Sequence, residues 1–150
     1  MRALTLLVLG AWLAGLSLVG TAATPVNSPP HGEVILSGHR FQVEIADTDA
    51  AREHGLMDRT HLAADHGMLF VYSQARIRLF WMKDTLIPLD ILFFDAHKRL
   101  INASADTPPC KTRTCPTYAS RAPAQYVLEL NAGIAEQLRL TPGALLQIQR

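Results

Sequence analysis

Residues 67–94 form one nearly uninterrupted apolar and aromatic block, with the sequence GMLFVYSQARIRLFWMKDTLIPLDILFF. A block of this kind has to be buried when the chain folds. Its polar interruptions divide it into predicted strands at residues 67–73, 78–83 and 90–95. Pro88 lacks a backbone N–H, so residues 85–89 are expected to form a turn or a sheet edge. The last of the three strands has no polar side and is expected to be buried on both faces.

The segments around this block also have the periodicity of strands. Phe41, Val43 and Ile45 alternate with polar residues in the segment 39–46, which is predicted to form a hairpin with residues 33–36. A short helix is predicted over residues 49–54, with Asp47 or Thr48 as its N-cap and Gly55 at its end. Further strands are expected at 99–106, 126–130 and 144–149, and a second short helix at about 132–138. The pattern predicts a mainly β fold, an antiparallel β-sandwich or barrel-like domain with one or two short helices.

The N-terminus has the order of a secretory signal peptide. Arg2 is followed by an uncharged apolar run from Leu4 to Val19 and then by small residues. A membrane anchor is the alternative, but the run is interrupted by glycines and is barely long enough to span a bilayer. We therefore expect residues 1–23 to be a signal peptide, 24–32 a flexible proline-rich tether, and 33–150 a single β-rich domain. The predicted location is periplasmic or secreted, without stable membrane insertion after cleavage.

The charge balance excludes some classes of partner. The chain has 14 basic and 13 acidic residues, and loss of Arg2 with the signal peptide would leave the two numbers equal. Nucleic-acid binding normally requires a basic excess or a basic patch, and no basic run is visible in the sequence. Nucleic acid is therefore not expected as a partner.

A long proline-rich loop is predicted over residues 107–125, and it contains both cysteines. In an oxidising compartment Cys110 and Cys115 are expected to form a disulfide, which would close a short loop and contribute about 2 kcal/mol in the chain-entropy model. A redox site is less favoured, because four residues separate the cysteines and no helix begins there. A zinc site is also less favoured, because only His97 lies nearby in the sequence.

Several short segments together resemble the family called domain of unknown function 192. These are Gly55-Leu56-Met57 with Arg59, Gly67-Met68-Leu69-Phe70, Phe80-Trp81-Met82-Lys83, Thr85, Pro88-Leu89-Asp90, the loop from Cys110 to Cys115-Pro116, and Tyr126-Val127-Leu128-Glu129 with Gly133. The resemblance covers about residues 34–149. It implies a small β-rich, sandwich-like domain, often exported in bacteria, with no established activity. Family members tend to have asparagine where this chain has Asp84, and an ionised carboxylate can accept hydrogen bonds but cannot donate them.

A candidate ligand-binding site is predicted from the charged residues that lie among apolar neighbours. Arg59, Lys83, Asp84 and Asp90 are such residues, and buried charges are tolerated when they are paired. We expect Arg59 to pair with Asp90. In the structural interpretation this pair, with Lys83 at the edge, fixes the helix against the central strands. In the functional interpretation Arg59, Trp81 and Lys83 line a cleft for a small polar or anionic ligand.

Two other kinds of site remain as alternatives. Asp84 and Asp90 could act as the acid and base of a small hydrolase. Met57, Met68 and Met82 could supply soft thioether ligands to copper, although methionines also fill gaps in protein cores. The six histidines show no metal-binding spacing, and no nucleophile elbow or phosphate-binding glycine loop is present. The sequence therefore favours a non-catalytic ligand-binding or accessory module without a cofactor, and it leaves the oligomeric state open.

Overall fold

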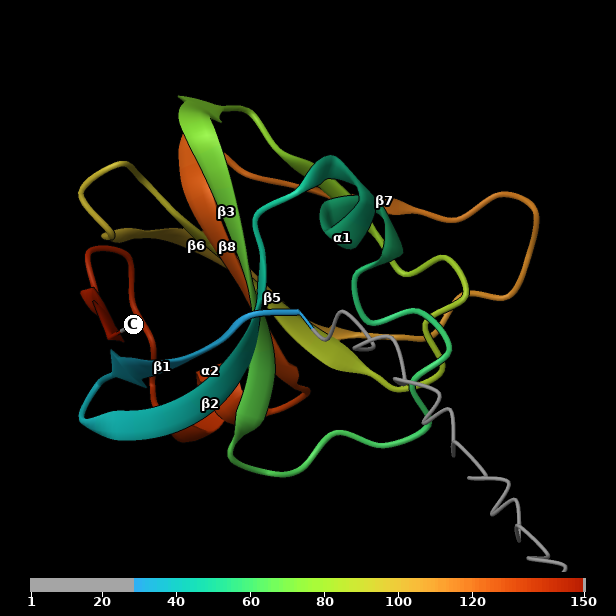
Figure 1. Ribbon diagram of the computed structural model, residues 1–150, viewed down its shortest axis with the longest axis horizontal. Coiled ribbons are helices and arrows are strands. Elements are labelled where there is room, and N and C mark those ends of the chain that lie inside the picture. Colours follow the sequence, from blue (N-terminus) through green and yellow to red (C-terminus); the bar gives the residue numbers. More distant parts are fainter. Residues whose placement is uncertain (1–28, 150) are drawn as a thin grey trace, which may run out of the picture.

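The structure, a computed structural model, describes residues 29–149 of the chain (Figure 1). The predicted signal peptide and most of the predicted tether lie outside these residues. The helices and strands are, in chain order, β1 (His31–Leu36), β2 (His39–Ala46), α1 (Asp49–His54), β3 (His66–Arg76), β4 (Leu79–Trp81), β5 (Leu89–Phe94), β6 (Leu100–Thr107), β7 (Thr117–Ala119), β8 (Ala124–Asn131), α2 (Ile134–Gln137) and β9 (Leu146–Gln149). The mainly β fold with two short helices is confirmed.

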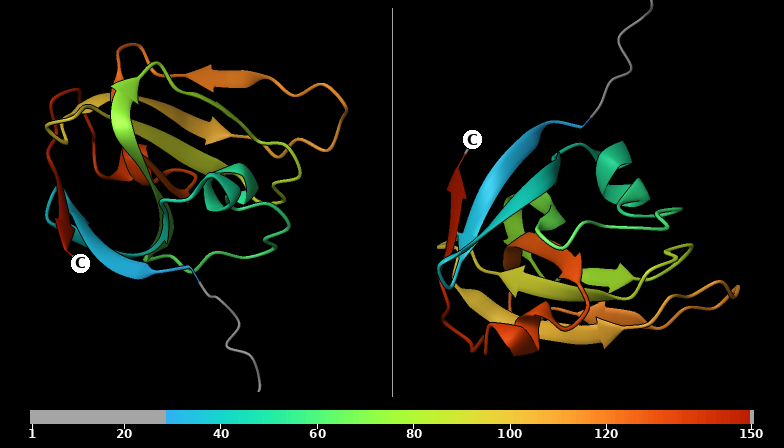
Figure 2. Two further views of the ribbon diagram at one scale, coloured as in Figure 1. Left: turned by 45° about the horizontal axis from the view of Figure 1, so that its top comes forward. Right: turned by 90° about the horizontal axis from the view of Figure 1, so that it is seen from below.

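Seven strands form one sheet in the order β6-β5-β8-β3-β2-β1-β9. The two views in Figure 2 show that this sheet is strongly curved. Its pairs are antiparallel except β2 and β3, which run parallel. The sheet is therefore mixed. Strand β3 runs parallel to β2 because the chain first passes through α1 and a loop between the two strands. An isolated bridge between Arg99 and Leu145 connects the two edges of the sheet, but the strands do not close into a barrel.

A second sheet is built from the short strands β4 and β7, which pair from Leu79–Ala119 to Trp81–Thr117. The predicted strand at 78–83 is thus shorter and does not join the main sheet. Strand β7 lies inside the segment that was expected to be a loop. Phe80 faces the main sheet and makes edge-on contacts with Phe70 and Phe93, at centroid distances of 4.9 and 5.8 Å. These aromatic contacts fix the small sheet against β3 and β5.

Apolar residues fill both faces of the central strands. One core lies inside the curve of the large sheet and includes Leu69, Leu92, Leu128 and α2 residue Ala135. The other lies on the opposite face, beneath α1 and the small sheet, and includes Met68, Phe70, Ile91, Phe93 and Val127. Residues 89–94 are all buried, and for residues 91–94 this agrees with the burial on both faces that their apolar sequence predicts. The second core forms the floor of the candidate site.

Candidate functional site

The predicted pair of Arg59 and Asp90 does not form. Arg59 pairs instead with Glu44 on β2, with Nη2 2.7 Å from Oε2. Asp90 lies at the start of β5 and is completely inaccessible to solvent. The prediction was wrong because sequence alone did not show that another carboxylate, Glu44, lies within reach of Arg59.

Asp90 has a structural task. Its Oδ1 accepts hydrogen bonds from the backbone N–H groups of Asp106 and Gly133, at 2.8 and 3.2 Å, and its Oδ2 accepts one from Ala135, at 2.7 Å. This carboxylate therefore joins β5 to β6 and to the first turn of α2, where backbone donors lack partners within the helix. Asp90 is not available to a ligand, which corrects its inclusion in the predicted cleft.

A large cavity beside α1 holds about 420 Å³ and is lined by both members of the Arg59–Glu44 pair. Three of its polar side chains are engaged with other groups, because Arg59 and Glu44 pair and the Thr48 hydroxyl accepts a hydrogen bond from Ala51 N–H at the start of α1. Pro29 and Pro30 line its rim. The chemistry of this cavity is consistent with a role in fixing α1 and the start of the domain.

A smaller pocket on the other side of the α1 C-terminus brings together predicted and unpredicted residues. It holds about 30 Å³ and is lined by Arg52, Glu53, His54, Gly55, Leu56, Met57, Phe70, Trp81, Lys83, Thr85 and Glu129. Trp81 and Lys83 were predicted to share a cleft, and they do. Trp81 lines this pocket and is 51% exposed. Arg59, Asp84 and Asp90 do not line this pocket.

Glu129 is the buried carboxylic acid of this small pocket, whereas Glu53 is exposed. It lies on β8, between Met68 on β3 and Ile91 on β5, and is only 5% exposed. Among the described residues, the Glu129 side chain has no ion-pair partner. Every fully buried side-chain oxygen in this part of the chain has a hydrogen-bond partner, whereas the carboxyl oxygens of Glu129 have none. These oxygens are therefore not fully buried, and they reach the surface of the pocket. Burial raises the pKa of Glu129 to about 8. At neutral pH this group is therefore mainly a neutral acid that can donate a hydrogen bond.

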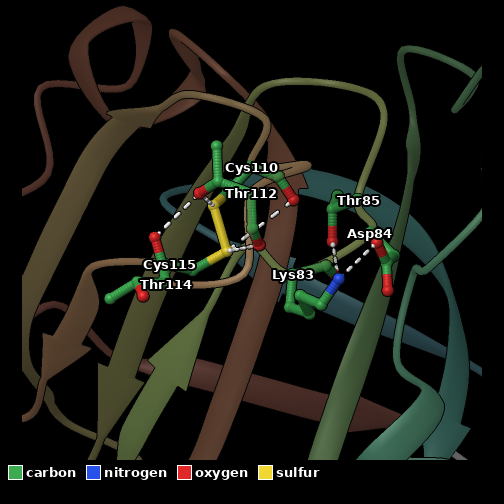
Figure 3. Close-up of polar contacts among 7 residues, drawn as sticks. All are labelled: Lys83, Asp84, Thr85, Cys110, Thr112, Thr114 and Cys115. Atoms are coloured by element: carbon green, nitrogen blue, oxygen red, sulfur yellow. Dashed lines mark hydrogen bonds and ion pairs between the residues drawn. A yellow bond between two sulfur atoms is a disulfide. The ribbon is translucent and has the colours of Figure 1, made fainter.

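Lys83 is held at the edge of the pocket by its neighbours (Figure 3). Its ammonium group lies 2.8 Å from Asp84 Oδ1, and its carbonyl accepts a hydrogen bond from the Thr85 hydroxyl at 3.5 Å. The side chains of Lys83 and Asp84 are 30% and 47% exposed, so the ion pair is open to water and weak. Lys83 can therefore exchange this partner for a ligand at small cost.

The predicted disulfide between Cys110 and Cys115 is present, and it lies beside Lys83 and Asp84 (Figure 3). Asp84 N–H donates to the Cys110 carbonyl at 2.9 Å, while the Asp84 carbonyl accepts from Asp58 N–H at 3.0 Å. The backbone of Asp84 thus joins the disulfide loop to the segment that follows α1. Asp84 has a φ of 53°, a conformation that asparagine and aspartate adopt more readily than other non-glycine residues. Aspartate is therefore compatible with the backbone conformation at this position.

The two alternative sites are not assembled within the described residues. Asp84 is half exposed, whereas Asp90 is fully buried, and its two oxygens accept hydrogen bonds from backbone N–H groups. Met57 lines the small pocket and Met68 the large one, while Met82 is fully buried and its sulfur accepts a hydrogen bond from Thr107. No group of three or more His, Cys, Asp or Glu residues in the described part could hold a metal ion.

Glu129 was not identified as a site residue from the sequence. The available signal was one carboxylate in an otherwise apolar strand, Tyr126-Val127-Leu128-Glu129-Leu130. Its meaning depends on the sheet order, which places β8 between β3 and β5 and so buries both faces of the strand. Neighbouring strands that are distant in the chain cannot be read from a local pattern.

Comparison with known proteins gives a family but no activity. Residues 33–148 match the family model DUF192, described as "Uncharacterized ACR". No curated protein matches the chain. A crystal structure of a protein of unknown function from Novosphingobium aromaticivorans is similar at 35% identity and a TM-score of 0.75, covering 84% of this chain and 91% of that one. Another, from Sinorhizobium meliloti and described as a candidate transcription regulator, has 38% identity and a TM-score of 0.75, covering 81% and 95%. This chain therefore belongs to the DUF192 family.

Proposed function

We propose that the protein is an exported, non-catalytic binding module that holds the polar end of a small ligand in the pocket beneath Trp81. The carrying observation is Glu129, a buried carboxylic acid without an ion-pair partner among the described residues, whose oxygens reach that pocket. A buried polar group that faces a pocket and makes no hydrogen bond to another protein group can form hydrogen bonds to a ligand.

The size of the pocket limits what it can accept. A volume of about 30 Å³ is sufficient for a group such as a carboxylate or hydroxyl, and not for a whole metabolite. The remainder of the ligand would lie over the exposed face of Trp81, which supplies apolar contact area. Lys83 supplies a positive charge at the edge, and neutral Glu129 supplies an O–H donor. A planar or apolar molecule with one carboxylate fits this arrangement best.

Benzoate is a suitable probe, because it combines a flat ring with one carboxylate. In NMR titrations of the purified protein at pH 6.5, benzoate should shift the backbone amide signals of Lys83, Thr85 and Glu129. Benzyl alcohol and benzamide should bind more weakly, because they lack the charge that attracts Lys83.

Substitutions test whether this binding uses the proposed groups. Lys83→Ala and Trp81→Ala should each weaken benzoate binding several-fold, while Lys111→Ala, which removes an exposed lysine of the nearby disulfide loop, should not. Above pH 8 the affinity should fall in the unmodified protein, because ionised Glu129 repels the carboxylate, and this fall should be absent in Glu129→Gln. A benzoate concentration of 20 mM is high enough to detect binding with a roughly millimolar dissociation constant. The proposed site would be refuted if no signals shifted at this concentration, or if the shifts were equal in all variants.

Export is supported by the leader pattern of the sequence and by the disulfide, since disulfides form in oxidising compartments. None of the helices in residues 29–149 is long and apolar enough to cross a membrane. Mass spectrometry of the protein recovered from the periplasmic or extracellular fraction of its host should show an N-terminus near residue 23 or 24 and an oxidised Cys110–Cys115 pair. A full-length N-terminus with free thiols in the cytosolic fraction would contradict export.

A further inference from the structure

A third concave surface, which shares Arg52 with the Glu129 pocket, is rich in arginine. It holds about 310 Å³ and is lined by Asp49, Arg52, Tyr72, Ser73, Gln74, Arg76 and Arg78. Two of the arginines come from the segment at the end of β3, and the third comes from α1. The cluster was not visible in the sequence, because Arg52 is far from the other two along the chain. The molecule as a whole is nearly neutral, so this local excess of positive charge is a property of the fold.

The arginines are held in place by the protein. Arg52 donates to the Val71 carbonyl at 2.8 Å and is only 19% exposed. Arg78 donates through Nε to the Ala124 carbonyl at 3.2 Å and through Nη2 to the Gln74 carbonyl. Its guanidinium carbon lies 3.5 Å from the centre of the Tyr72 ring, and that of Arg52 lies 5.1 Å from it. The two cations therefore lie against one aromatic ring in fixed positions.

These contacts leave charge and donors unused. Asp49 is the one acidic residue lining this pocket, and it pairs with Arg52 while its own side chain remains open to solvent. Arg76 is hydrogen-bonded to the neutral Gln74 side chain. Each guanidinium carries more N–H donors than these acceptors occupy. Burial is the main cause that lowers the pKa of Arg78, and the neighbouring Arg76 and Arg52 act in the same direction. A bound anion would relieve this repulsion.

We infer that this pocket, formed by Arg52, Arg76, Arg78 and Tyr72, binds the phosphate group of a phosphomonoester. Arginine forks match the spacing of phosphate oxygens, and a phosphate dianion balances the two arginines that have no acidic partner among the described residues. Tyr72 adds a phenol whose pKa is raised by burial, so it remains a hydrogen-bond donor. The volume exceeds the needs of a carboxylate and leaves room for part of the attached molecule. This inference is independent of the proposed function.

Two sources could present such a group. Ile77 and Leu79, which alternate with the arginines, are 55% and 66% exposed and could rest on a lipid surface. A soluble phosphomonoester would leave these side chains in water. The shared chemistry is the phosphate group, and the experiment separates the two sources.

Isothermal titration of the purified protein with inorganic phosphate and with glycerol 3-phosphate, at low ionic strength, tests the pocket itself. Both should bind, and Arg76→Gln and Arg78→Gln should weaken the affinity roughly tenfold, the effect of losing one charge-assisted hydrogen bond. Arg76 is exposed and anchors no backbone carbonyl in the structure, so its substitution should leave folding intact even if Arg78→Gln does not. Arg121→Gln is the matched control, because Arg121 is exposed and lies outside this pocket.

Vesicles of phosphatidylcholine with and without phosphatidic acid identify the source. Capture that requires phosphatidic acid and that glycerol 3-phosphate reverses indicates a lipid headgroup, whereas binding of glycerol 3-phosphate without vesicle capture indicates a soluble ligand. Either result supports the pocket if Arg76→Gln weakens that binding roughly tenfold. Absence of binding to both soluble phosphates, or equal affinity in Arg76→Gln, Arg121→Gln and the unmodified protein, would overturn the inference.

Discussion

Glu129 on β8 stands directly opposite Met68 on β3, so that a carboxylic acid lies beside a thioether in the apolar layer between the central strands and α1. Its other cross-strand neighbour is Ile91. Neither neighbour can stabilise a negative charge, and only 5% of Glu129 is exposed to water. The ionised form of Glu129 is therefore costly in the folded protein.

This cost makes stability depend on pH. The pKa of Glu129 rises from 4.5 to about 8 on folding, so between these values the folded protein holds a proton that the unfolded chain has released. Stability therefore decreases as pH rises through this range, by about 1.4 kcal/mol per pH unit where the difference is complete. Glu129→Gln removes this titration. Urea unfolding at pH 5, 7 and 9 should show the variant close to the unmodified protein at pH 5 and several kcal/mol more stable than it at pH 9.

The comparison between the two proteins isolates Glu129, because all other titrating groups are shared. Parallel stability curves for Glu129→Gln and the unmodified protein would show that this carboxyl has no raised pKa. Glu136→Gln, on the short helix α2, is a control that should run parallel to the unmodified protein.

Asp90 is predicted to be essential for folding. Asp90→Ala removes the acceptor for three backbone N–H groups and leaves them buried without a partner, which should cost about 3 to 5 kcal/mol. Asp90→Asn retains one acceptor oxygen and should cost less. Chemical unfolding measures both effects. Asp106→Asn is the control, because the Asp106 side chain is exposed and the substitution keeps the backbone N–H that Asp90 accepts. A loss below about 1 kcal/mol in Asp90→Ala would contradict this structural role.

The partner of Arg59 can be tested by double-mutant cycles. Arg59 and Glu44 should show a coupling energy of about 0.5 kcal/mol, since the arginine side chain is 42% exposed and water screens the pair. Arg59 and Asp90 should show none beyond experimental error. The free energies of unfolding of the single and double alanine variants supply both values, with Asp90→Asn replacing the alanine variant if the latter does not fold. A larger coupling to Asp90 than to Glu44 would reverse the assignment.

The disulfide should stabilise both the domain and the edge of the pocket. Replacing Cys110 and Cys115 by serine should lower stability by about 2 kcal/mol, the value expected for a short closed loop. Because Asp84 N–H donates to the Cys110 carbonyl, amide hydrogen exchange at Asp84 should accelerate. The backbone N–H of Asp106, which donates a hydrogen bond to Asp90 Oδ1, serves as the reference within the same molecule. Equal acceleration at both amides would indicate general destabilisation and no local effect on the pocket edge.

Local patterns were sufficient to predict most of the elements. The α1 boundaries, Thr48 as a possible N-cap and the positive φ of Gly55 follow from capping chemistry, and the alternation in residues 39–46 identifies β2. The parallel pairing of β2 and β3 was not predicted, because it depends on how the chain crosses over between them. Strand β7 was missed, because three residues are too few to show a period.

The grouping of residues around the small pocket was predicted only where the residues are close in the sequence. Trp81 and Lys83 are two positions apart on one short segment, and they do line one pocket. The partners of Arg59 and Asp90 are distant in the chain. The Arg59–Glu44 pair depends on the parallel register of β2. The hydrogen bonds of Asp90 to Gly133 and Ala135 depend on the turn before α2. The apolar neighbours of these charged residues in the sequence indicated that the charges needed partners, but they did not identify the partner residues.

The first and last strands are neighbours in the large sheet, with Glu33 paired to Gln149 and Leu36 to Leu146. Strand β1 can therefore obtain its second partner only when residues 146–149 are available. Folding of this domain cannot be completed before these residues have been synthesised. Removal of residues 146–149 would expose the edge of β1 to intermolecular pairing.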